Sequence, residues 1–88
     1  MKNIDEQVRA AVMYGDWFAN CNTIVSHDGD RFKVVLHGSV IAEGHSDHHG
    51  DFTVDRATFA GWPTNTTRRR LRALDVDTIE LAKKEEAE

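Results

Sequence analysis

Residues 22–43, NTIVSHDGDRFKVVLHGSVIAE, decide the fold, because β-branched and aromatic residues form short runs there with turn residues between them. The DGD sequence of residues 28–30 predicts one tight connection, and His37 with Gly38 predicts a second. These strands should therefore follow one another as an antiparallel meander. The expected strands are residues 22–27, 31–36 and 39–43, with a further short strand at residues 51–54.

The segments on either side of the meander have different patterns. Apolar residues recur at helical spacing in residues 3–14, which predicts an amphipathic helix that ends near Gly15. Trp17 and Phe18 follow it and are interpreted as packing residues. Apolar residues alternate with polar ones in residues 78–83, which favours a last strand. Spaced charges in the same segment leave a helix as the alternative.

A second helix is expected after the meander, within GWPTNTTRRRLRAL at residues 61–74. Gly61 and Pro63 predict a turn, because glycine permits unusual backbone angles and proline restricts the residue that precedes it. Thr64 and Thr66 are both candidate N-caps, since a threonine hydroxyl accepts a hydrogen bond from an unpaired amide of the first turn. The helix is expected over residues 66–74.

This helix has an apolar side and a basic side. Thr67, Leu71 and Leu74 share one stripe, and Arg70 lies at the flank of that stripe. Three further arginines are predicted to face solvent and form the candidate binding surface. They are Arg68, Arg69 and Arg72. Trp62, just before the helix, is an additional candidate because an exposed indole can stack on a base.

The charge distribution strengthens the interest in these arginines. The chain has 11 Lys plus Arg and 15 Asp plus Glu, so removing the four arginines of residues 68–72 leaves 7 basic residues against 15 acidic ones. One basic helix on an acidic body suggests a localised contact with phosphates or with a carboxylate-rich protein surface. The alternative is that the arginines are simply solvated, or paired with nearby carboxylates such as Asp75 and Asp77.

Length and composition restrict the class of protein. Eighty-eight residues with 40% apolar residues suit one domain with a modest core, and an elaborate enzyme is disfavoured. The single cysteine, Cys21, cannot form an internal disulfide and is interpreted as a small buried residue. No apolar run approaches the roughly 20 residues of a membrane span, and the N-terminus does not resemble a signal sequence. The protein is expected to be soluble and cytoplasmic.

The histidine-rich stretch GHSDHHGD, residues 44–51, is the strongest chemical motif outside the arginine helix. His45, His48 and His49 with two aspartates offer metal ligands, but their spacing matches no standard paired motif. An exposed turn is the preferred interpretation, so neither a metal nor a cofactor is expected. His37 has no recognisable nucleophile partner and is interpreted as a turn residue. No catalytic residue is therefore assigned, and the protein is expected not to be an enzyme.

Three blocks in order suggest a relationship. NTIV at residues 22–25, VLHGSVIA at residues 35–42 and AGWPTNTTRRRLRAL at residues 60–74 resemble small, mostly uncharacterised bacteriophage proteins with NTxV, LHGxxIA and GWPTxTTRxRLNxL blocks. The resemblance covers residues 22–81. It implies a phage or prophage origin, and hence an infected or lysogenic bacterial host, without implying an activity. Arg72 stands where these proteins commonly have asparagine, so this helix is more basic.

Together these observations predict an α+β domain with a three- to four-stranded antiparallel sheet packed against one or two helices. Residues 1–21 would be an N-terminal helical extension, residues 22–81 the core and residues 82–88 a charged tail. The leading hypothesis is a non-enzymatic phage accessory protein that binds DNA or RNA through its arginine helix. The alternatives are a modulator that binds a host protein and a structural accessory domain. A homodimer is compatible with the sequence, because short edge strands or the N-terminal helix could pair.

Overall fold

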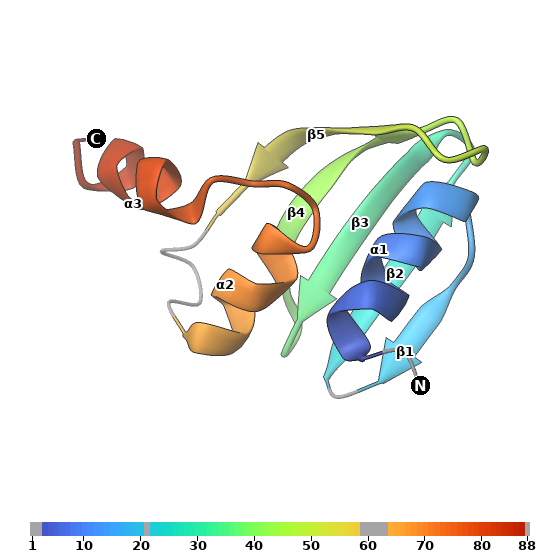
Figure 1. The fold of residues 1–88 in the computed structure, drawn as a ribbon, viewed down its shortest axis with the longest axis horizontal. Helices are drawn as coiled ribbons and strands as arrows, with labels where there is room; N and C mark the ends of the chain where they lie inside the picture. The colour runs from blue at the N-terminus through green and yellow to red at the C-terminus, as the bar shows by residue number, and fades with distance from the viewer. Residues whose placement is uncertain (1–2, 21, 59–63, 88) are drawn as a thin grey trace.

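A computed structural model describes residues 3–20, 22–58 and 64–87 and has one antiparallel sheet with two helices on one face (Figure 1). The strands lie in the order β1-β2-β3-β4-β5, which is their order in the chain. The strands are β1 (Phe18–Asn20), β2 (Thr23–Asp28), β3 (Arg31–Leu36), β4 (Ser39–Ser46) and β5 (Phe52–Ala57), and the helices are α1 (Ile4–Tyr14), α2 (Asn65–Arg72) and α3 (Thr78–Ala87). The predicted α+β class and antiparallel meander are confirmed.

The turns and the register follow from the sequence pattern. His37 and Gly38 have φ angles of 51° and 82°, which suits a two-residue turn between paired Leu36 and Ser39. Side chains then alternate between the two faces of the sheet. In β3, for example, Phe32, Val34 and Leu36 are buried, whereas the residues between them are more exposed. The alternation places one apolar side of the meander against the helices.

The core lies between the sheet and the two helices α1 and α2. It contains side chains from the sheet and from both helices, and α1 also contacts α2 directly. The fully buried large residues of the sheet are Val25, Phe32, Val34, Leu36 and Ile41, those of the helices are Val8, Val12 and Leu71, and Leu74 is buried just after the end of α2. Burying each such side chain contributes about 1.5–3 kcal/mol of transfer free energy, so both helices are integral to the fold.

The N-terminal helix forms where it was predicted. The Asn3 side chain accepts a hydrogen bond from the Glu6 amide at 2.8 Å, and Gly15 ends the helix in the left-handed conformation with φ 75°. Val8, Ala11 and Val12 are buried. The helix therefore covers the sheet and supplies part of the core, whereas the sequence placed it at the edge of the core.

The expected number and bounds of the strands were wrong, and so was the expectation for Trp17. The sheet has five strands, because β1 pairs with β2 through Phe18 opposite Val25. Three residues are too few to produce a readable alternation, so β1 was missed. β4 continues to Ser46, beyond the expected end at residue 43. Trp17 is 71% exposed and does not pack into the core as expected.

The last element is also different from the expectation, because α3 is a helix and not a strand. The Asp77 carboxylate accepts hydrogen bonds from the amides of Ile79 and Glu80, each at 3.1 Å, and so caps the helix start. Leu81 packs against the core, while Ile79 is 69% exposed. The apolar residues of this segment are too few to distinguish the strand period of 2 residues from the helix period of 3.6. The Asp77 cap then favours the helix.

Candidate functional site

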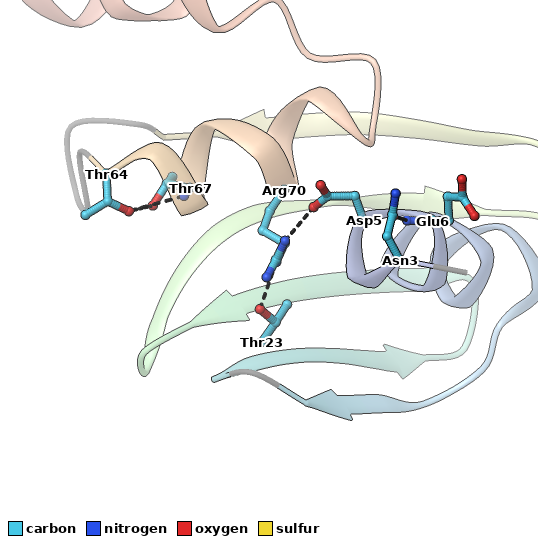
Figure 2. Close-up of polar contacts among 7 residues, drawn as sticks. All are labelled: Asn3, Asp5, Glu6, Thr23, Thr64, Thr67 and Arg70. Atoms are coloured by element: carbon cyan, nitrogen blue, oxygen red, sulfur yellow. Dashed lines mark hydrogen bonds and ion pairs between the residues drawn. The ribbon is translucent and has the colours of Figure 1, made fainter. Parts of the chain in front are cut away.

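Thr64, one of the two candidate N-caps, caps α2. The helix spans Asn65–Arg72, so it starts one residue earlier and ends two residues earlier than the expected range of 66–74. Thr64 has extended backbone angles, and its hydroxyl accepts a hydrogen bond from the Thr67 amide at 3.2 Å (Figure 2). Its hydroxyl also lies 3.2 Å from the Thr67 hydroxyl. Thr66 lies inside the first turn, so it is not the cap. The cap fixes where the helix starts and therefore which way each arginine points.

Replacing Thr64 with alanine is expected to lower the free energy of unfolding by about 1 kcal/mol, because one amide of the first turn loses its acceptor. Thermal denaturation followed by circular dichroism measures this change. Thr64→Ser, which keeps the hydroxyl, is the matched control and should stay close to the parent. Equal stability of the alanine and serine variants would contradict the capping role.

Arg70 differs from the other arginines of α2 because its side chain is buried. It is 7% exposed, and its Nε donates a hydrogen bond to the Thr23 hydroxyl at 3.0 Å. Its Nη1 forms an ion pair with the Asp5 carboxylate. Figure 2 shows the side chain directed from α2 toward Asp5 on α1 and Thr23 on β2. Arg70 is therefore an internal tie between two helices and the sheet.

Arg68, Arg69 and Arg72 form the arginine surface of α2. All three are exposed, whereas Thr67 and Leu71 on the other side of the helix are buried. The helical stripe predicted from the sequence is confirmed, and the three arginines that were predicted to face solvent are exposed. Arg69 and Arg72 lie in the last turn, where cations also interact favourably with the carbonyl end of the helix. A contribution to helix stability thus accompanies any binding role.

The carboxylates considered as partners of these arginines have other roles. Asp75 forms an ion pair with Arg9 of α1 at 2.9 Å, and Arg9 also donates to the Ala73 carbonyl. Asp77 caps α3, as described above. Asp75 therefore fastens the end of α2 to α1, and the arginine surface lies on the adjoining solvent side of the helix. The last sequence candidate, Trp62, lies outside the described residues.

The histidine-rich segment does not gather its side chains at one point. His45 extends from β4 and pairs with Asp55 of β5. His48 packs edge to face against His27 with ring centres 5.2 Å apart. Within residues 3–20, 22–58 and 64–87, no three His, Cys, Asp or Glu side chains are grouped in a way that could hold a metal ion. His37 lies in the exposed β3–β4 turn.

Asp47 organises the β4–β5 connection. Its carboxylate accepts hydrogen bonds from the amides of His49 at 2.7 Å and Asp51 at 3.1 Å. These two bonds lower the pKa of the Asp47 carboxyl, because they stabilise its charged form. Residues 47–51 therefore form a hydrogen-bonded turn, whereas Gly44, His45 and Ser46 belong to β4, so the turn interpretation of GHSDHHGD was wrong for the first part of the stretch.

No local motif in the sequence indicated which residues hold Arg70. Asp5 and Thr23 are separated from it by 65 and 47 residues, and neither belongs to a local motif with it. The only hint was the position of Arg70 beside the apolar stripe, which is compatible with partial burial. Among the helices that the structure describes, none has the length and apolar composition needed to span a bilayer.

Comparison with known proteins gives one match. The family model described as Kyanoviridae Gp96 protein matches residues 1–85. The match includes the N-terminal helix, which the resemblance in the sequence blocks did not cover. No curated protein and no solved structure matches the chain.

Proposed function

We propose, from the premise that the chain belongs to the Kyanoviridae Gp96 protein family of phage proteins, that it is a non-enzymatic accessory protein that binds nucleic acid. The observation that carries this proposal is the arginine surface of α2, which combines three exposed guanidinium groups on one short helix. The proposal places the protein in the cytoplasm of the infected host, where phage nucleic acid is present.

The anchoring of α2 supports a role in binding. Arg70, Thr64 and the buried leucine side of the helix hold α2 against the rest of the protein. Arg68 and Arg72 are one helical turn apart, a rise of about 6 Å, so they present two cations from a fixed backbone. A pre-organised cationic surface loses less conformational entropy on binding than a flexible tail does.

Phosphate oxygens are the expected ligands of this surface. Guanidinium groups bind phosphates through paired N–H donors, and contacts of this kind carry little sequence information. With three phosphate contacts, the logarithm of the binding constant should fall with the logarithm of salt concentration at a slope of about −2.7 for duplex DNA. The expected slope for a single strand is about −2.1. Binding by one chain should therefore be weak at physiological salt.

The test is fluorescence-anisotropy binding to mixed-sequence single- and double-stranded DNA and RNA at several salt concentrations. A variant with Arg68, Arg69 and Arg72 all replaced by alanine should lose at least tenfold in affinity at low salt, and the remaining slope should approach zero. Circular dichroism checks that the variant is folded. Comparing the affinities for the single and double strands at the same salt concentration identifies the preferred form of nucleic acid.

A charge-matched control separates the arginine surface from general electrostatics. The double variant Arg69→Ala, Arg72→Ala removes two exposed cations from α2, and Lys83→Ala, Lys84→Ala removes two from α3. The first pair should reduce affinity much more than the second. Equal losses would assign binding to net charge alone. Absence of binding to all four nucleic acids at low salt would reject the proposal in favour of a host-protein partner.

A further inference from the structure

We name the face of the sheet opposite α1 and α2 the outer face. The strand register shows which side chains are neighbours on it. Within the described residues no helix lies on it, and its side chains form rows across the strands. Ala19 of β1 lies opposite Ile24, Ile24 opposite Val35, and Val35 opposite Val40. Ile24 and Val40 are 43% and 42% exposed. Four aligned aliphatic side chains therefore make a continuous apolar row that faces solvent.

A row of opposite charges runs beside the aliphatic row. Lys33 of β3 lies opposite Glu43 of β4, and Glu43 lies opposite Arg56 of β5. On the other side of Lys33 the row continues to Ser26 of β2. The signs therefore alternate from strand to strand, and the Arg56 side chain at the end of the row is 83% exposed.

The charges of the whole outer face cancel. Its basic residues are Arg31, Lys33 and Arg56, and its acidic residues are Asp28, Glu43 and Asp55. A balanced face with alternating signs has no net attraction for the phosphates of a nucleic acid. It is instead complementary to a second face on which the same charges alternate but are displaced by one strand, because opposite charges then meet. The same face of a second copy of this chain has that property.

We propose that the outer face is a dimer interface on which a second copy packs about a two-fold axis. The axis runs along the strands, between β3 and β4. This operation places Val35 of each copy over Val40 of the other, and Lys33 of each copy over Glu43 of the other. The interface is isologous, so each favourable pair occurs twice. Two sheets packed in this way are separated by about 10 Å, with their strands nearly aligned.

The same axis gives Arg56, which pairs with Glu43 of its own chain at 3.7 Å, a second contact on the other copy. It places β5 of the second copy over β2, and the register then brings the second copy's Arg56 over Ser26. Ser26 lines a hollow of about 440 Å³ together with Trp17, and the lining carries two carboxylates and two cations, which are Asp28, Glu43, Arg31 and Lys33. A guanidinium can stack on the indole of Trp17, and the two carboxylates offset the two cations that also line the hollow. The 71% exposure of Trp17 is then explained by what covers it.

The molecule is large enough for an interface of typical area only if that interface covers the whole outer face. A stable interface buries about 800 Å² on each partner, and the molecule measures 35 × 24 × 21 Å. The aliphatic row alone is too narrow to supply this area, so the charged row and the hollow must also be covered. The helices lie on the other side of the sheet, so the arginine surfaces of both copies remain accessible. The inference does not rest on the nucleic-acid proposal.

The test is a charge exchange between two separately purified variants, with molar mass measured by light scattering after size exclusion over a range of concentrations. The parent should approach twice the 9.9 kDa of one chain as concentration rises. Lys33→Glu places two acidic residues over each other in a homodimer, and Glu43→Lys places two lysines there. Each variant alone should be monomeric. Their equimolar mixture should form a heterodimer, because only that pairing restores both Lys–Glu contacts.

The mixture also separates the interface from effects within one chain. Lys33 and Glu43 are neighbours in the same sheet, so either variant could be less stable by itself, but mixing cannot repair an intrachain contact. If either variant fails to fold, Val40→Lys replaces it, with Ile79→Lys on α3 as the control for adding a lysine at an exposed apolar site. Val40→Lys should abolish the dimer and Ile79→Lys should not. A monomeric parent at every concentration, dimers in both single-charge variants, or monomers in their mixture would overturn the proposal.

Discussion

Replacement of Gly44 by alanine is expected to disrupt the pairing of β4 with β5 and to cause the largest loss of stability of any single methyl addition considered. A Cβ atom at residue 44 would lie 1.9 Å from the Thr53 carbonyl oxygen and 3.0 Å from the Val54 Cα atom. Both atoms belong to the backbone of β5, so no side-chain rotation can make room. Overpacking without relief costs about 3 kcal/mol or more, and thermal denaturation should show a much lower midpoint.

Gly29→Ala is the matched control for this prediction. It adds the same methyl group in the β2–β3 turn, where nothing lies within 4 Å of the new atom. Its φ of +62° still gives a cost of about 1–2 kcal/mol, because a Cβ atom is unfavourable in the left-handed region. The alanine at residue 44 should therefore be clearly less stable than the one at residue 29. The reverse order would contradict the close approach of β5 to Gly44.

The second large effect is expected from Asp5→Ala. This change removes the carboxylate that pairs with Arg70 and leaves the guanidinium, with a side chain only 8% exposed, bonded to the neutral Thr23 hydroxyl. A buried charge that loses its partner costs about 3–5 kcal/mol. The lower end of this range is expected, because Asp5 is 32% exposed and water can enter its place. Urea denaturation monitored by circular dichroism gives the change in the free energy of unfolding.

A double-mutant cycle shows whether the loss comes from the isolated charge. Asp5→Ala combined with Arg70→Met removes both charged groups and keeps an apolar side chain of similar length, so it should recover much of the stability. Asp75→Ala is a comparison with an exposed ion pair, since it breaks the Arg9–Asp75 contact at 38% and 72% exposure. That variant should cost less than about 1 kcal/mol. A similarly small effect of Asp5→Ala would show that Arg70 is hydrated and not held internally.

The position of Arg70 affects how the arginine block is studied. Substituting all four arginines together would remove three surface charges and one internal tie, and loss of binding would then be confounded with loss of folding. Variants of Arg68, Arg69 and Arg72 leave the contacts of Arg70 with Asp5 and Thr23 in place. Binding and stability can therefore be measured separately in this helix.

The sequence by itself determined the elements whose information is local. The run at residues 31–36 alternates clearly and is bounded by turn residues, so β3 was predicted at its true bounds. The stripe of Thr67, Leu71 and Leu74 likewise predicted the buried side of α2, and Thr64 was one of the two candidate caps for its start. Turn chemistry, helix capping and hydrophobic periodicity all act over a few residues, and a single sequence contains that information.

The elements whose own residues form little recognisable pattern were predicted wrongly. β1 has three residues and is defined mainly by its pairing with β2, so periodicity could not reveal it. Gly44 suggested that β4 had ended, but the bare backbone there permits β5 to pass closely, and the strand continues to Ser46. Residues 78–87 contain too few apolar side chains to define a period, and α3 was predicted as a strand.

Only the tertiary structure decided which side chains meet. It removed Arg70 from the predicted basic cluster, because its partners Asp5 and Thr23 come from α1 and β2. It also aligned Ile24, Val35 and Val40 in one exposed row, which depends on the register of three strands. The sequence shows the chemical character of each of these six side chains, whether apolar, polar or charged. Their roles depend on distances between segments far apart in the chain, and folding alone fixes those distances.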